Sequence, residues 1–147
     1  MIDRQTVVTH WAERWRTIRA WGRPLEEVAV AVRERKERVG STGSAWPQRR
    51  GMVVRAGADM PDALETILHE YAHLAVSGAE HHGEEWSAML AAAVLEVTGI
   101  AISTDGTKSV TDHAATDALR VWWRVTGHEF AWGLLQKRAR LRRQSAP

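Results

Sequence analysis

The chain has 147 residues, of which 44% are hydrophobic and 26% are charged, so we expect one folded domain rather than a disordered, fibrous or membrane-spanning protein. It contains no cysteine, which excludes disulfides, thiolate metal sites and a cysteine nucleophile. Any metal ion must therefore be held by His, Asp or Glu. We expect a single domain over residues 1–147, with a basic C-terminal tail at about residues 137–147.

The formal net charge of +2 is unevenly distributed along the chain. No acidic residue follows Glu129, and five cations lie close to the C-terminus: Lys137, Arg138, Arg140, Arg142 and Arg143. Subtracting their +5 from +2 leaves residues 1–136 with a net charge of −3. The tail, rather than a broad basic face, is therefore the candidate for a contact with DNA, and the alternative is a solvated helix end. Because the longest apolar run covers only residues 88–95, we expect no membrane contact and a cytoplasmic location.

The N-terminal part of the chain predicts a helix followed by a strand. Apolar residues recur at helical spacing before a turn at residues 22–24: Val7, Val8, Trp11, Trp15 and Ile18. This pattern is typical of an amphipathic helix with its tryptophans in the core. Valine and alanine alternate over residues 28–32, which favours a strand, although Pro24 and the acids after it also suit the start of a helix.

Two more short strands are predicted at residues 38–46 and 51–56, on either side of a polar segment at 47–50. We expect these strands and the preceding one to form a small antiparallel sheet of three strands. The remaining chain is helical in pattern, so the fold class is α+β.

Three helices are predicted after the sheet. Asp59 and Pro61 are signals for the start of a helix, whose apolar stripe ends before Gly78. A second helix is expected from about residue 83 to residue 98, where Gly99 ends it. A third and longer one is expected at about residues 114–143, with glycines that can kink it.

The first of these helices contains the sequence His69-Glu70-Tyr71-Ala72-His73, an HExxH motif. Side chains four residues apart on a helix lie one above the other, so two imidazoles can bind one ion at about 2.0–2.1 Å. Glu70 lies about 100° around the helix axis from His69, which suits a general base rather than a ligand. Tyr71 is expected to be a core residue.

A third ligand is expected at the start of the second helix, where two histidines follow each other. His82 continues the apolar stripe of Trp86, whereas His81 lies on the polar side, so His82 is the predicted ligand. A glutamate ligand from the same helix is the alternative, with Glu96 at the most suitable distance and Glu84 and Glu85 as the other candidates.

With these residues in place, the sequence resembles the SprT-like zinc metallopeptidases, the family that includes Spartan, over about residues 28–104. The resemblance lies in the strand-rich segment, the HExxH helix and the sequence His82-Gly83-Glu84-Glu85-Trp86 that opens the next helix. It implies a zincin-like fold and one Zn²⁺ ion held by His69, His73 and His82, with Glu70 as the catalytic residue. Many members add a cysteine-based zinc module, so the resemblance covers only the peptidase core.

These residues together predict a zinc-dependent endopeptidase. Three neutral imidazoles leave the fourth zinc position for water, and Glu70 can accept a proton as that water attacks a peptide carbonyl. His113 is a candidate for stabilising the oxyanion. Because an extended peptide can pair with an open sheet edge, the segment expected to bind substrate is Met52, Val53, Val54 and Arg55.

Two other hypotheses remain open at this stage. The first is a catalytically silent zinc protein that regulates a partner or associates with DNA. The second is an HExxH protein of mobile elements that cleaves a regulator, which would differ in its third ligand.

Overall fold

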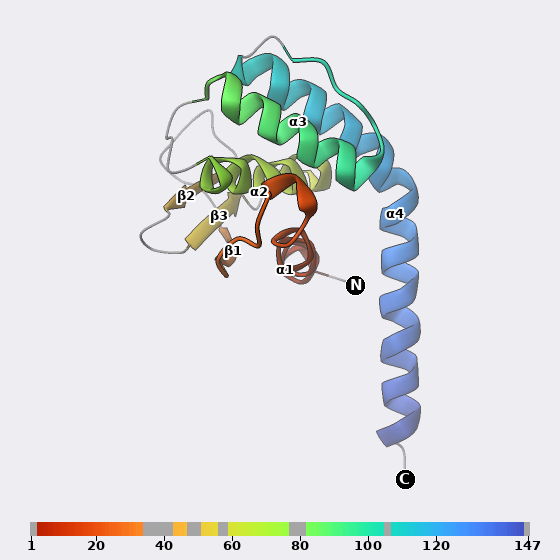
Figure 1. Cartoon of the computed structure of the whole chain (residues 1–147). Helices are drawn as coiled ribbons and strands as arrows, with labels where there is room; N and C mark the ends of the chain where they lie inside the picture. The colour runs from red at the N-terminus through yellow and green to blue at the C-terminus, as the bar shows by residue number, and fades with distance from the viewer. Residues whose placement is uncertain are drawn as a thin grey trace.

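The computed structural model describes residues 3–33, 43–46, 51–55, 59–76, 82–104 and 107–145. Within these ranges the chain is mainly helical and includes a small sheet (Figure 1), which confirms the mixed fold class in outline. The elements are α1 (Arg4–Trp15), the short 3₁₀ helix η1 (Arg19–Trp21), β1 (Ala29–Arg33), β2 (Gly43–Trp46), β3 (Gly51–Arg55), α2 (Met60–Ala75), α3 (Glu84–Thr98) and α4 (Lys108–Ser145).

The sheet has three strands in the order β1-β3-β2. β2 is antiparallel to β3, as predicted, but β1 is parallel to β3, with Ala29 opposite Gly51 and Arg33 opposite Arg55. The prediction of a wholly antiparallel sheet is therefore wrong. Parallel neighbours need a connection of about a dozen residues or more, and residues 34–50 supply it, with β2 inside that connection.

β3 lies in the centre of the sheet, so the prediction that Met52, Val53, Val54 and Arg55 form an edge strand is wrong. The side chains of Met52 and Val54 are buried in the core. Both neighbours of β3 are strands, and its backbone is used for pairing with them.

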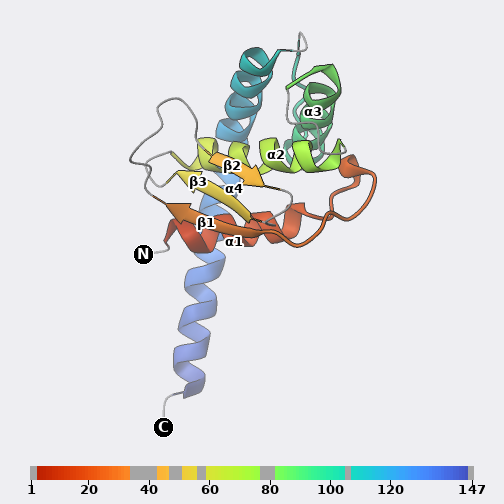
Figure 2. The ribbon, with the colours of Figure 1, turned by 90° about the vertical axis from the view of Figure 1, so that its left-hand side faces the viewer.

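The outer edge of β1 is covered by a side chain of α1. The amide of Gln5 donates from Nε2 to the Val30 carbonyl at 2.8 Å and accepts at Oε1 from the Val32 backbone N–H at 2.9 Å. Gln5 thus makes the two bonds that a neighbouring strand would make. β2 is at the other edge of the sheet and lies beside α2 (Figure 2).

α2 runs through the middle of the domain, between the sheet and α1 on one side and α3 and α4 on the other (Figure 1). Its N-terminus is capped as predicted, because the Asp59 carboxylate accepts a hydrogen bond from the Asp62 backbone N–H at 2.9 Å. Every residue from 63 to 72 is buried, so the position of α2 is set on all sides. The predicted stop at Gly78 lies outside the described residues.

The tryptophans that fall on helical stripes lie in the core, as predicted. Trp11, Trp15 and Trp86 are buried, and Trp122 of α4 packs against Trp11 and Trp15 with ring centroids 5.0 and 5.8 Å apart. These contacts join α4 to α1. They stabilise this packing because large aromatic side chains bury much apolar area.

α4 begins at Lys108, earlier than the sequence predicts, and continues through Gly127 and Gly133 without a break. Its early start places Asp112 and His113 on a helix instead of in a loop. The C-terminal part of α4 extends away from the rest of the domain (Figures 1 and 2). Among the described residues, no helix has the length and apolar character needed to cross a bilayer.

Tyr71 is a core residue, as predicted. It is 1% exposed, its hydroxyl donates to the Ala12 carbonyl at 2.7 Å, and its ring meets Trp21 edge-on. Burial raises the pKa of Tyr71 to about 12. Although it stands between the two histidines of the motif in sequence, its hydroxyl joins α2 to α1.

Tyr71→Phe removes this hydrogen bond and leaves the ring in place. We expect a loss of about 1 kcal/mol in the free energy of unfolding and a fall of about 2–4 °C in Tm, measured by thermal and denaturant unfolding. Metal binding should stay at the wild-type level, and a variant that unfolds normally but loses metal would contradict the assignment to the core.

Candidate metal centre

α2 presents two imidazoles on one side, near its C-terminal end. His69 is buried and His73, one turn later, is half-buried. Their ring centroids lie 5.1 Å apart, as expected for residues four apart on a helix. The HExxH prediction for the helix and for its two histidines is therefore matched by the geometry.

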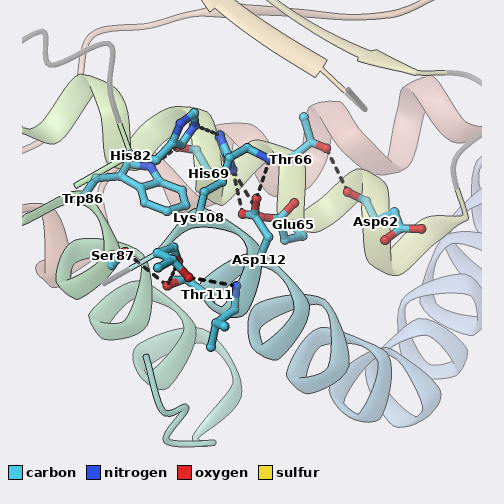
Figure 3. Close-up of polar contacts among 12 residues, drawn as sticks. Asp62, Glu65, Thr66, His69, His82, Trp86, Ser87, Lys108, Thr111 and Asp112 are labelled. Carbon is cyan, nitrogen blue, oxygen red and sulfur yellow. Dashed lines mark hydrogen bonds and ion pairs between the residues drawn. The ribbon is translucent and has the colours of Figure 1, made fainter. Parts of the chain in front are cut away.

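His82 reaches the same point from the segment just before α3 (Figure 3). Its Nε2 atom lies 2.9 Å from Nε2 of His69 and 3.0 Å from Nε2 of His73. We call these three residues the histidine triad. Two nitrogens that bind a tetrahedral zinc ion at 2.0–2.1 Å are about 3.3 Å apart. The triad therefore fits one divalent ion after an adjustment of a few tenths of an ångström.

Trp86 forms the floor of the triad. Its ring lies 4.7 Å from His69, 5.5 Å from His73 and 4.7 Å from His82 between centroids, and it stacks on His73. The indole N–H donates to the main-chain carbonyl of His69 at 3.1 Å. Trp86 is 1% exposed, so it closes the core side of the triad while His73 and His82 remain partly open to solvent.

Two carboxylates lie behind His69, on the side away from the triad. Nδ1 of His69 is 2.8 Å from Oδ1 of Asp112 and 3.5 Å from Oε1 of Glu65 (Figure 3). Nδ1–H therefore donates to Asp112, and Nε2 is the nitrogen that faces the triad. Burial alone would lower the pKa of His69, but the hydrogen bond and charge of Asp112, together with the nearby Glu65 carboxyl, outweigh it and raise the pKa to about 10. A divalent ion that binds His69 at Nε2 must therefore displace a tightly held proton from that nitrogen.

The two acids are in different states. Burial raises the pKa of Glu65 to about 8, so this side chain is mainly protonated at neutral pH. Burial also acts against the charge of Asp112, but its hydrogen bonds with His69, Glu65 and Lys108 hold its pKa well below the ordinary value. One negative charge therefore faces His69 from behind.

His82 and Glu70 are shifted in directions that suit a metal site. Burial and the positive charges that His69 and His73 can carry lower the pKa of His82 to about 4, so its ring is neutral and can bind a metal. Burial raises the pKa of the Glu70 carboxyl above its ordinary value. The charges of His69, Asp112 and Lys108 also act on the pKa of Glu70.

The glutamates considered as a third ligand do not join the triad. Glu84 and Glu85 are exposed on the first turn of α3. Glu96, near the other end of α3, accepts hydrogen bonds from the backbone N–H groups of Arg19 at 2.9 Å and Ala20 at 2.7 Å. It therefore caps η1, and the alternative of a Glu96 ligand is wrong.

The other predicted residues are not part of the triad. His113 is exposed on α4 and is not among the residues whose ligand atoms converge. His81 lies outside the described residues. Asp112, Glu65 and Trp86 are the residues of the site that sequence analysis did not assign a role. The i,i+4 spacing of Glu65 and His69 is visible in the sequence, but nothing in it connects Asp112 with His69, 43 positions earlier.

Glu65, His69 and Asp112 are a second group whose ligand atoms lie within 4.8 Å of one another. In this group His69 would bind through Nδ1, the nitrogen whose hydrogen bonds to Asp112. Because an imidazole that binds metal through Nε2 keeps its proton on Nδ1, the acids serve better as partners of a ligand than as a second ion site.

Comparisons of the chain with models of protein families, with curated proteins and with solved structures found no match. The resemblance to SprT-like peptidases therefore stays a prediction, and the case for a function rests on the residues of the site.

His82→Ala should abolish the binding of one Zn²⁺ or Co²⁺ per chain, because two imidazoles alone hold a divalent ion weakly. Metal content after dialysis and the visible spectrum of the Co²⁺ form are the measurements. His128→Ala, on an exposed part of α4, and Glu96→Ala should both keep the metal. Loss of metal in Glu96→Ala with retention in His82→Ala would contradict the triad.

Proposed function

We propose that the protein is a zinc-dependent metallopeptidase of SprT-like type. The observation that supports this most directly is the convergence of three Nε2 atoms, at 2.9 and 3.0 Å. Glu70, which follows His69 in the chain, has a buried carboxyl on which the charge of His69 acts. Three His ligands with an open fourth position are typical of catalytic zinc sites, whereas structural sites are usually closed by four protein ligands. The partial exposure of His73 and His82 supports an open position.

The proposed reaction is hydrolysis of a peptide bond without a covalent intermediate. When bound, Zn²⁺ supplies Lewis acidity, which polarises the peptide carbonyl and lowers the pKa of a water molecule to about 7. Glu70 accepts a proton from that water as it attacks, and then gives the proton to the leaving amine. A carboxyl whose pKa is raised by burial is a better match to both steps than an exposed one.

We place the substrate along β2 in this proposal, instead of along β3. β3 is paired on both sides and the outer edge of β1 is occupied by Gln5, whereas β2 is an edge strand on the side of α2. An extended peptide that pairs with β2 gains main-chain hydrogen bonds, which depend little on the side chains of the peptide. We therefore expect a loose sequence preference.

Glu70→Gln should lower the rate of hydrolysis of an unfolded protein such as casein by about 100- to 10,000-fold, because the amide cannot accept the proton. Zinc content should be unchanged. Glu84→Gln, an exposed acid of α3, is the matched control and should keep full activity. Full turnover by Glu70→Gln would contradict the mechanism, and a zinc-loaded wild type with no hydrolysis would favour a silent regulatory protein.

A second proposal concerns the C-terminal part of α4, which we infer contacts DNA. In support of it, the tail defined by residues 137–147 contains five cations and no acid, and the described part of it belongs to a helix that extends from the domain. Lys137, Arg140 and Arg143 are exposed. A positively charged helix of this kind can neutralise several phosphates at once.

Arg140→Gln should weaken binding to a DNA duplex and reduce the salt dependence of the affinity by about one counterion, because each phosphate contact contributes about −0.9 to the slope. Fluorescence anisotropy at several salt concentrations measures both. Arg124→Gln, also exposed on α4 but outside the tail, should have a smaller effect. Equal effects of the two changes would mean that the tail has no special role.

A further inference from the structure

We propose that Asp112 is a positioning residue of the metal centre, which makes the first turns of α4 a part of that centre. Asp112 holds the Nδ1–H of His69, and so fixes both the tautomer and the orientation of the ring that must offer Nε2 to the ion. The inference rests on the proposed metal site, and it adds a residue that the HExxH motif does not contain.

The contact between Asp112 and His69 has the geometry of a strong hydrogen bond. Oδ1 of Asp112 lies 2.8 Å from Nδ1, and both side chains are largely buried, with 19% and 11% of their surfaces exposed. A charge-assisted bond of this length is stronger than one between neutral groups. Imidazoles that bind metals generally donate their other N–H to a carboxylate or carbonyl, which raises their basicity and fixes the ring.

The other oxygen of Asp112 is held as well. Oδ2 lies 3.0 Å from Nζ of Lys108, which is one turn earlier on α4 and half exposed. The carboxylate is therefore fixed between a cation on its solvent side and an imidazole on its inner side (Figure 3). With both oxygens engaged, rotation of the carboxylate away from His69 would cost two contacts.

The backbone that carries Asp112 is anchored next to Trp86. The hydroxyl of Thr111 is 3.1 Å from the hydroxyl of Ser87 and 2.8 Å from the carbonyl of Thr107, so Ser87 can donate to Thr111 while Thr111 donates to Thr107. Thr111 and Ser87 are fully buried. Trp86 and Ser87 of α3 thus contact His69 on one side and α4 on the other, and this fixes Asp112 relative to the triad.

A purely structural role for Asp112 would be to hold α4 against α2. The buried residues Ala115, Ala118 and Leu119 already pack α4 into the core that contains α2, so the two roles make different predictions. A structural role affects stability and leaves the ring tautomer and the intrinsic zinc affinity unchanged. A positioning role changes the tautomer and the affinity even when the protein remains folded.

The experiment measures the zinc affinity of the full chain by competition with a chromophoric chelator, for wild type, Asp112→Asn, Asp112→Glu and the control Asp117→Asn, which changes an exposed acid of α4. We expect Asp112→Asn to bind zinc about 10- to 100-fold more weakly, Asp112→Glu to recover part of the loss, and Asp117→Asn to match wild type. Nitrogen-15 NMR of wild-type protein loaded with zinc should show His69 with its proton on Nδ1.

Several results would overturn the inference. Wild-type affinity in Asp112→Asn, or a zinc-loaded His69 with no proton on Nδ1, removes the role of Asp112 and leaves the metallopeptidase proposal standing. A wild type that binds no zinc removes both. Because the tautomer is read in the wild type, the test holds even if Asp112→Asn does not fold.

Discussion

The candidate site depends on the burial of α2 on all sides. A helix packed against a sheet, α1, α3 and α4 cannot rotate about its axis without opening the core, so the direction of His69 and His73 is set by apolar packing elsewhere. His82 then reaches these histidines from the segment before α3, Trp86 from α3 and Asp112 from α4. The buried imidazole of His69 is tolerated there because it is paired with the carboxylate of Asp112.

The parts of the site that the sequence predicts are those with local signals. The cap at Asp59, the stripe of α2 and the four-residue spacing of its histidines all depend on neighbours within one or two turns. His82 was chosen by helical phase, because it continues the apolar stripe of Trp86. These features survive in the folded chain because tertiary packing agrees with the local pattern.

The parts that were wrong or missed depend on contacts between distant residues. Alternation in residues 28–32 indicates a strand but carries no information about its direction, so the parallel pairing of β1 with β3 was not predicted. The segment before residue 114 is rich in Ser and Thr and resembles a loop, yet Thr107 and Lys108 begin α4 there. Because the sequence predicts a loop there, it gives no reason to place Asp112 beside His69, which lies 43 positions earlier.

The amide of Gln5 has a consequence for how the sheet can grow. It occupies the outer edge of β1, so among the strands that the structure describes only β2 offers an edge for pairing with another strand. A peptide or a second copy of the chain that adds a strand to the sheet would then pair at β2, so Gln5 limits such growth to one edge.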